Sequence, residues 1–341
     1  MNQKIFVTDC EGPLSVNDNA YEICQEFIPN GSELFTILSN YDDVLVEKSG
    51  DENYRAGSTL KLILPFLYAY NVMNDDIIEY SQDNIYLLHG ALDTLNYITN
   101  IMPAYIVSTS YNQYIEALCN VTGFNYENTY STRLDLDKYN IDIGELEKIK
   151  QYKEEILNDS SFENIHKIFI EKFPLLESNK MILDVVPIGG LGKKESIIDI
   201  VNKNNYQPEN IMYLGDSITD TDVLDYIKNH NGLSISFNGN EHAINTADIA
   251  VITDNTVITS LISEIFNNND LKTVYDFISK FNENPFDAIN QYSNNNKLIQ
   301  ELLINKLPII KKITSDNKDD LIIRSKNIRN QVRGENIGLL G

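Results

Sequence analysis

A short apolar segment near the start of the chain ends abruptly at an acidic pair, in the run KIFVTDCEGP over residues 4–13. This short apolar run, half of it β-branched, predicts a buried strand. In an open α/β sheet, ligands bind just beyond the carboxyl ends of the strands, so Asp9 is expected at the active edge of a sheet. Glu11 follows two residues later, and Gly12-Pro13 predicts a turn that leads the chain away.

Three later segments repeat this pattern of a polar side chain at the end of a strand or the start of a helix. AYIVSTS predicts a strand that leads to Ser108, and GKKE places Lys193 and Lys194 at the start of a helix. IMYLGDSITD predicts a strand followed by Asp216, with Asp220 one helical turn further on. With the first segment, the order is strand-Asp, strand-Ser, helix-start Lys and strand-Gly-Asp-x3-Asp.

This order resembles the four motifs of the haloacid dehalogenase (HAD) superfamily, whose members are mostly Mg2+-dependent phosphatases and phosphotransferases. The resemblance covers roughly residues 4–255, and the element order after Ser108 is similar to that of the phosphoserine phosphatase branch. More narrowly, the chain resembles archaeal predicted HAD hydrolases named subunit R of energy-converting hydrogenase A.

Strands that alternate with helices predict an α/β fold with a doubly wound parallel sheet, and the resemblance implies a Rossmann-like HAD core. The expected core spans residues 1–16 and 86–265 and contains a helical insertion at about 142–180. Residues 17–85 are expected to form a helical cap over the active site. Residues 266–341 are expected to form a C-terminal extension that is wholly helical over most of its length.

The resemblance makes Asp9 the nucleophile, since a carboxylate there can form an aspartyl-phosphate. Ser108 and Thr109 are expected to hydrogen-bond the phosphoryl oxygens. The lysine that binds the same group is expected to be Lys194, because apolar residues follow it at positions +3 and +4. Lys193 is the alternative.

The cofactor that the resemblance implies is Mg2+, which prefers hard oxygen ligands. Asp9, the backbone carbonyl of Glu11 and Asp216 would supply them, and Asp220 would orient a water on the metal. Glu11 stands where the family usually has a second Asp, and Pro13 where it usually has a Thr. Glu11 is one methylene longer, so the protonation of the leaving group is the step that these departures affect.

Two further side chains have alternative interpretations. Arg55, in the loop before the most apolar helical segment, can bind a substrate carboxylate or phosphate through paired hydrogen bonds, or can simply be a solvated loop residue. Cys10 can be a nucleophile beside Asp9, but a small buried thiol is the favoured interpretation. The three cysteines show no metal-binding spacing.

The net charge of −23 opposes binding to nucleic acid or to an anionic membrane. No apolar run approaches the ~18 residues that a membrane span needs, so a cytoplasmic protein is expected. The segment over residues 306–333 reverses the overall charge, with eight basic against three acidic residues. It and residues 142–180 are the candidate surfaces for a protein partner.

The leading hypothesis is a Mg2+-dependent phosphatase that acts on a small phosphorylated metabolite. The alternative is a weakly active or non-catalytic HAD-fold subunit that docks on a larger, hydrogenase-type assembly. A receiver-like phospho-acceptor fits poorly, because receiver domains are far shorter and carry no cap.

Overall fold

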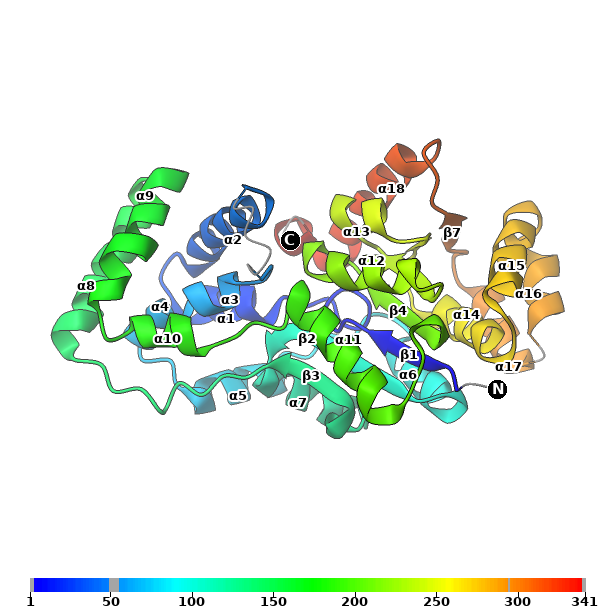
Figure 1. Ribbon diagram of the computed structural model, residues 1–341, viewed down its shortest axis with the longest axis horizontal. Helices are drawn as coiled ribbons and strands as arrows, with labels where there is room; N and C mark the ends of the chain where they lie inside the picture. Colours follow the sequence, from blue (N-terminus) through cyan, green and yellow to red (C-terminus); the bar gives the residue numbers. More distant parts are fainter. Residues whose placement is uncertain (1–2, 49–54, 294, 339–341) are drawn as a thin grey trace.

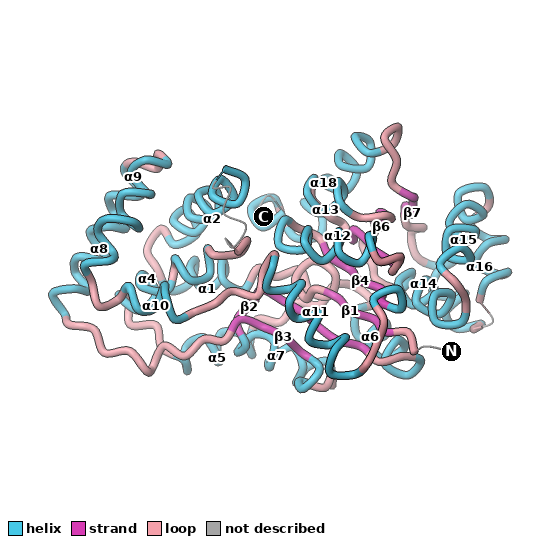
Figure 2. Tube along the Cα trace, viewed as in Figure 1, coloured by secondary structure: helices cyan, strands magenta, loops and turns pink. Residues whose placement is uncertain are grey.

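The centre of the computed structural model, which describes residues 3–48, 55–293 and 295–338, is a seven-stranded sheet in the order β3-β2-β1-β4-β5-β6-β7 (Figures 1 and 2). All its strands are parallel except β7, which runs antiparallel to β6. This mostly parallel α/β sheet confirms the predicted fold class. The strands are β1 Ile5–Thr8, β2 Ala104–Tyr111, β3 Thr129–Thr132, β4 Ile211–Gly215, β5 Leu233–Phe237, β6 Ile249–Ile252 and β7 Ile309–Lys312.

Strand β1 lies in the middle of the sheet and is buried on both faces. Ile5 and Val7 belong to the apolar cluster on one face, and Phe6 belongs to the cluster on the other. Successive side chains of a strand point to opposite faces, and helices cover both faces of a parallel sheet. The first segment is therefore apolar throughout rather than alternating.

Helices cover both faces of the sheet (Figure 1). One face packs against α6 (Ala91–Ile101), α7 (Asn112–Thr122) and α14 (Val257–Asn268), and the other against α11 (Leu191–Asn204), α12 (Thr221–Asn229) and α13 (Glu241–Thr246). Short helical turns η1 (Tyr126–Asn128), η4 (Pro208–Asn210) and η5 (Ile218–Asp220) lie at the ends of strands. None of the helices in the described ranges is long and apolar enough to cross a membrane.

A helical lobe, defined as residues 17–85 and 134–185 apart from 49–54, lies at one end of the molecule (Figure 1). The first insertion supplies α1 (Asn19–Phe27), α2 (Gly31–Lys48), α3 (Thr59–Leu62), α4 (Leu64–Ala69) and α5 (Asn74–Asp83). The second supplies α8 (Ile143–Asn158), α9 (Phe162–Lys167), the π-helical turn η2 (Ile168–Lys172), η3 (Phe173–Leu175) and α10 (Asn179–Asp184).

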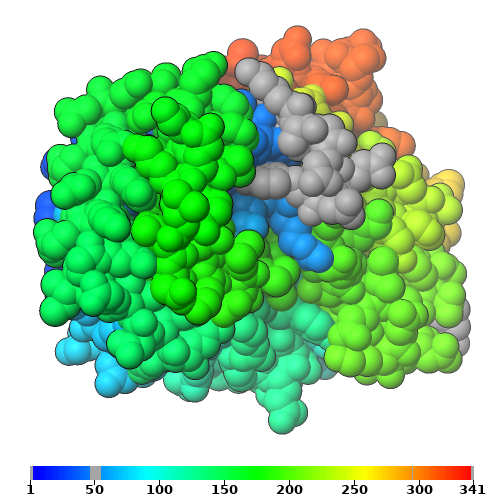
Figure 3. Space-filling model, turned by 60° about the vertical axis from the view of Figure 1, so that its left-hand side comes forward, coloured from blue at the N-terminus to red at the C-terminus, as the bar shows by residue number. Residues whose placement is uncertain are grey.

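The two insertions share a single apolar core. The ring of Phe66 in α4 lies 6.4 Å from that of Phe169 and 5.8 Å from that of Phe173, measured between centroids. Lys153 of α8 is buried and donates from Nζ to the Pro29 carbonyl across 3.0 Å. In the space-filling view, the second insertion (green) lies over the blue helices of the first (Figure 3). Residues 142–180 therefore complete the lobe through their buried face.

The prediction of a wholly helical C-terminal extension is wrong at β7. Ile310 pairs with Val251 of β6 and is buried, while α15 (Leu271–Glu283), α16 (Pro285–Tyr292) and α17 (Asn296–Ile304) pack near α14. The backbone N–H and C=O groups at the open edge of β6 are available for hydrogen bonding, and β7 pairs with them. The local sequence of β7 gives no sign of that distant edge. After β7, α18 (Lys318–Arg333) and α19 (Glu335–Gly338) return to the middle of the molecule (Figure 1).

Candidate active site

The candidate site lies where the strand order reverses. From β1 the chain proceeds outward through β2 and β3 on one side, and from β4 through β5 and β6 on the other. In sheets of this kind, ligands bind at that switch point, beyond the carboxyl ends of the strands. Asp9 directly follows β1, its N–H donates to the Leu214 carbonyl of β4 across 2.9 Å, and Asp216 directly follows β4.

Three buried carboxylates meet at this point. Asp9, Asp216 and Asp220 each offer an oxygen within 4.8 Å of the others. Lys193, whose side chain is fully buried, donates from Nζ to Asp9 Oδ2 across 2.5 Å and to Asp220 Oδ1 across 2.7 Å. The lysine therefore bridges two of the three carboxylates.

The lysine at the site is Lys193, which corrects the choice of Lys194. Helix α11 begins at Leu191, and Lys193 shares its sheet-facing side with the buried Ile197 and Ile200. Residues at i, i+4 and i+7 lie on one helix face, so the relevant apolar spacing is counted from Lys193. Lys194 points elsewhere, with Nζ 5.8 Å from the ring centroid of Tyr226.

Asp220 is held in place by donors from its own segment and from β4. Its Oδ2 accepts from the backbone N–H groups of Asp216 at 2.9 Å and Ser217 at 3.1 Å, and its Oδ1 accepts from the Tyr213 hydroxyl at 2.6 Å. A side chain at Gly215 would clash, because its Cβ would lie 2.5 Å from Asp220 Cγ. Asp220 is thus a positioning group as well as a partner of Lys193.

The charges of the site depend on one another. Burial raises the pKa of Asp9 to about 7, with Lys193 acting in the opposite direction and the carboxylates of Asp220 and Asp216 adding to the rise. Burial alone would lower the pKa of Lys193, but Asp220 and Asp9 together hold it above its usual value. A cation bound among the carboxylates would favour ionised Asp9.

The donor set fits Mg2+. Asp9 and Asp216 supply carboxylate oxygens, which a hard divalent cation prefers, and Asp220 lies close enough to hold a ligand in place. Gly12 packs directly against Asp216, where no larger residue fits, since a Cβ there would lie 2.3 Å from Asp216 Oδ2. The carboxylate of Glu11 lies outside this cluster of three.

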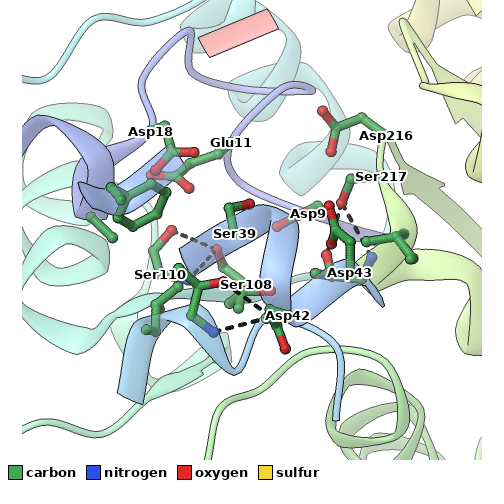
Figure 4. A pocket seen from close by; sticks show the side chains of 18 of the residues that line it. Asp9, Glu11, Asp18, Ser39, Asp42, Asp43, Ser108, Ser110, Asp216 and Ser217 are labelled. Carbon is green, nitrogen blue, oxygen red and sulfur yellow. Dashed lines mark hydrogen bonds between the residues drawn. The ribbon is translucent and has the colours of Figure 1, made fainter. Parts of the chain in front are cut away.

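Glu11 instead points to the start of α1, where its Oε1 accepts from the N–H of Asn19 across 2.7 Å. It lies near Asp18, the N-cap residue of α1 (Figure 4). Burial and then the charge of Asp18 raise the pKa of Glu11 well above its usual value. Glu11 therefore carries a proton more readily than an ordinary glutamate and still faces the pocket.

A pocket of about 100 Å³ opens above the carboxylates. Figure 4 shows acidic and hydroxyl side chains converging on it from β2, the β1 and β4 loops and α2. Its lining from the core is Asp9, Glu11, Ser108, Thr109, Ser110, Asp216, Ser217, Ile218, Thr219, Arg329 and Arg333. Its lining from the lobe is Asp18, Ala20, Phe35, Ser39, Asp42, Asp43, Gly57, Thr59 and Leu60.

Ser108 and Thr109 line this pocket, as the sequence predicts, although β2 continues through them to Tyr111. The pairing of β2 with β3 shifts register between Val107 and Tyr111. The Ser108 and Ser110 hydroxyls lie 3.0 Å apart and share a hydrogen bond. Ser110 is therefore an additional hydroxyl beside the expected pair.

Two other candidate side chains lie away from the site chemistry. Arg55 pairs with Glu195 of α11, its Nη2 lying 2.8 Å from Oε2, and it is not among the residues that line the pocket. Cys10 is buried and its burial raises the pKa of its thiol well above the usual range. Cys10 contributes to the site through its backbone N–H rather than its thiol, donating to Asp9 Oδ1 across 2.6 Å.

The sequence interpretation missed two arginines that face the site from α18. Arg329 and Arg333 both donate from Nη1 to Asp216 Oδ2, the second across 3.2 Å. Their i, i+4 spacing in a basic segment was an available signal, since it places both on one helix face. The sequence around α18 gives no sign that this helix face contacts Asp216, which lies more than a hundred positions earlier in the chain.

Solved structures of similar architecture were found for this chain. The structure of gene product AF1437 from Archaeoglobus fulgidus matches with a TM-score of 0.84 and 24% identity, covering 100% of this chain and 99% of that one, so the two share a fold. A phospho-aspartyl intermediate analogue of phosphoserine phosphatase is less similar, with a TM-score of 0.48, 17% identity and coverage of 73% and 93%. No protein-family model and no curated protein sequence matches the chain.

Proposed function

We propose that the chain is a HAD-type, Mg2+-dependent phosphohydrolase that acts on a small phosphorylated metabolite through an aspartyl-phosphate on Asp9. The observation that carries the proposal is the bridge from Lys193 to Asp9 and Asp220 at the switch point, with Asp216 beside it. A lone carboxylate after a strand is commonly a turn residue. Three that meet around one buried lysine form a site at which a phosphoryl group can be bound and transferred.

In the first half of the reaction, each of these groups has a defined role. One carboxylate oxygen of Asp9 attacks phosphorus while the bond to the ester oxygen breaks, and Glu11 gives its proton to the departing oxygen. Lys193 stabilises negative charge on the phosphoryl oxygens, and the Ser108 hydroxyl donates to one of them. Asp9 and Asp216 would hold Mg2+, which would supply further positive charge to the same oxygens.

In the second half, water attacks phosphorus of the acyl phosphate. Its proton passes to the Glu11 carboxylate, the bond between phosphorus and the Asp9 oxygen breaks, and inorganic phosphate leaves. This restores both carboxyl groups. The pocket of about 100 Å³ favours a small leaving group.

The experiment that tests this function is a screen of phosphorylated metabolites for phosphate release with Mg2+ and with excess EDTA. The proposal predicts release from at least one phosphate monoester that EDTA abolishes. Asp225→Asn, on an exposed part of α12, is a matched control that should keep the activity. A complete absence of Mg2+-dependent release across sugar, amino-acid and alcohol phosphates would contradict the proposal.

A second candidate function is docking on a larger assembly through the second insertion. Ile143, Leu175 and Leu183 of that insertion are 77%, 84% and 70% exposed, which is unusual for large apolar side chains. The other candidate surface, residues 306–333, directs two of its arginines inward to Asp216. Co-purification with a partner that Leu175→Asp and Leu183→Asp release would favour this role, and it is compatible with catalysis.

A further inference from the structure

The C-terminal helix α18 brings two positive charges to the candidate cation site. The side chains of Arg329 and Arg333 are only 3% and 7% exposed. Both guanidinium groups donate from Nη1 to the same oxygen, Asp216 Oδ2. A carboxylate proposed to bind a divalent cation thus already has two cations of the protein beside it.

The two guanidinium groups also tie the neighbouring loops together. Arg333 donates to the Asn17 carbonyl across 2.6 Å and to the Val16 carbonyl across 3.2 Å. Arg329 donates to the Gly338 carbonyl across 3.0 Å and to the Asp216 carbonyl across 3.3 Å. Because each guanidinium group donates both to Asp216 and to backbone carbonyls, the two arginines are held beside Asp216 and act on the charge of the site.

We propose that Arg329 and Arg333 are built-in counter-ions of Asp216 that compete with the divalent cation and thereby set its affinity. The inference rests on the proposed cation at Asp9 and Asp216. Asp216 Oδ2 is already enclosed by the arginines and by Gly12, whose missing Cβ would lie 2.3 Å away. The cation therefore binds close to two fixed positive charges.

Removing an arginine has two opposite effects on the affinity for Mg2+, and the larger of the two decides whether that affinity rises or falls. Loss of a group that orients a ligand typically weakens metal binding about 10–100-fold. At the effective dielectric constant of about 20 that applies to charges in proteins, repulsion between a single and a double positive charge within roughly 5 Å exceeds ~100-fold in affinity. The charge effect is the larger, so removal of Arg329 should tighten Mg2+ binding.

The same competition links the cation to the C-terminal helix. If Arg329 and Arg333 weaken Mg2+ binding, then bound Mg2+ weakens their contact with Asp216 by the same factor. Backbone amides of α18 should therefore exchange hydrogen faster in the presence of Mg2+ than in its absence. Amides of α8, which lies at the far end of the lobe (Figure 1) and contributes no residue to the pocket lining, provide the internal reference.

The experiment is a calorimetric titration of the full-length protein with MgCl2 alone, without substrate. Arg329→Met removes the charge, Arg329→Lys keeps it, and Arg333→Met removes the second charge. Arg324→Met is the matched control, because Arg324 lies exposed on the same helix and pairs with Asp320. Circular dichroism establishes that each variant is folded, and Arg333→Met decides the question if Arg329→Met does not fold.

The expected result is Mg2+ binding that is at least ~10-fold tighter in Arg329→Met, moderately tighter in Arg333→Met, and close to wild type in Arg329→Lys and Arg324→Met. Equal or weaker binding in the folded Met variants would overturn the inference, as would an Arg329→Lys protein that behaves like Arg329→Met. Absence of binding in every protein would overturn it too. A lack of phosphatase activity alone would count against the proposed reaction and leave the titration result standing.

Discussion

Lys193 donates from Nζ to Asp9 Oδ2 across 2.5 Å, a contact that joins residues 184 positions apart in the sequence. The lysine is fully buried, and its second carboxylate partner, Asp220, lies 2.7 Å away. A buried ion pair is costly to break, because the partner left behind is an uncompensated charge. The contact therefore fixes Asp9 relative to the end of β4 and keeps positive charge at the site.

The first prediction separates Lys193 from its neighbour. Lys193→Met should lower phosphate release by about 10²–10³-fold, because it removes a preorganised positive charge from the phosphoryl site. Lys194→Met should stay close to wild type, since Lys194 contacts the ring of Tyr226 instead. Steady-state rates of the two variants at saturating Mg2+ provide the measurement. Equal losses of phosphate release in the two variants would show that Lys193 has no greater role in the reaction than Lys194.

The second prediction concerns Glu11. As the proposed general acid, it should contribute about 10²–10⁴-fold on alkyl phosphates, whose leaving groups need a proton, and much less on aryl phosphates. Glu11→Gln should therefore slow the alkyl substrates far more than the aryl ones. A comparison of kcat/KM for matched alkyl and aryl esters measures this difference. The same loss on both classes would leave Glu11 with a structural role at the start of α1, where it accepts from Asn19.

The third prediction uses two glycines with left-handed backbones. Gly12 and Gly123 have φ of +97° and +71°, so alanine at either position costs about 1 kcal/mol in backbone strain. Only at Gly12 would the new Cβ meet another group, at 2.3 Å from Asp216 Oδ2. Gly12→Ala should therefore also lose Mg2+ binding and activity, whereas Gly123→Ala should keep both. Urea unfolding and Mg2+ titration of the two variants test this pairing.

The fourth prediction is a pH dependence of stability at Glu22. Burial raises the pKa of Glu22 to about 7, opposed by the hydrogen bonds from Asn17. The folded state therefore holds this proton more tightly than the unfolded state. The stabilisation that results is complete below the unfolded pKa of about 4.3 and is lost as pH rises toward 7.

Glu22→Gln removes that titration and should make the protein more stable than wild type by about 1–3 kcal/mol near pH 8, with the difference shrinking toward pH 5. Glu26→Gln, on the exposed side of the same helix, is the control and should show no such trend. The free energy of unfolding in urea at both pH values gives the answer. A gain that is independent of pH would exclude Glu22 as the titrating group.

Strand ends explain why much of the site could be placed from sequence. Asp9 and Asp216 directly follow β1 and β4, and the carboxyl ends of parallel strands meet at one edge. Ser108 ends the apolar part of β2, although the strand itself continues to Tyr111. The lysine was misplaced by one position because consecutive helical residues point about 100° apart, and the apolar pattern of α11 fits either choice locally. Only the contact of Ile197 and Ile200 with the sheet shows that Lys193, rather than Lys194, lies on the sheet-facing side of α11.

Long-range partners explain what could not be predicted. Arg329 and Arg333 meet Asp216 only because β7 joins the sheet edge and turns α18 back across the site. Similarly, residues 142–180 appear polar and self-contained in sequence, yet their apolar face completes the lobe core with Phe66. In both cases the segment's partner lies far away in the chain, and no local periodicity records it.

In the proposed reaction, Asp9 is the phosphorylated nucleophile of a Mg2+-dependent phosphohydrolase. The most direct measurement is intact-protein mass spectrometry after acid quenching of a reaction with substrate and Mg2+, for the wild type and Asp9→Asn. We expect a single phosphoryl adduct that maps to Asp9 in the wild type, and neither adduct nor phosphate release in a folded Asp9→Asn protein. Turnover by Asp9→Asn at the wild-type rate, or an adduct on another residue, would contradict it.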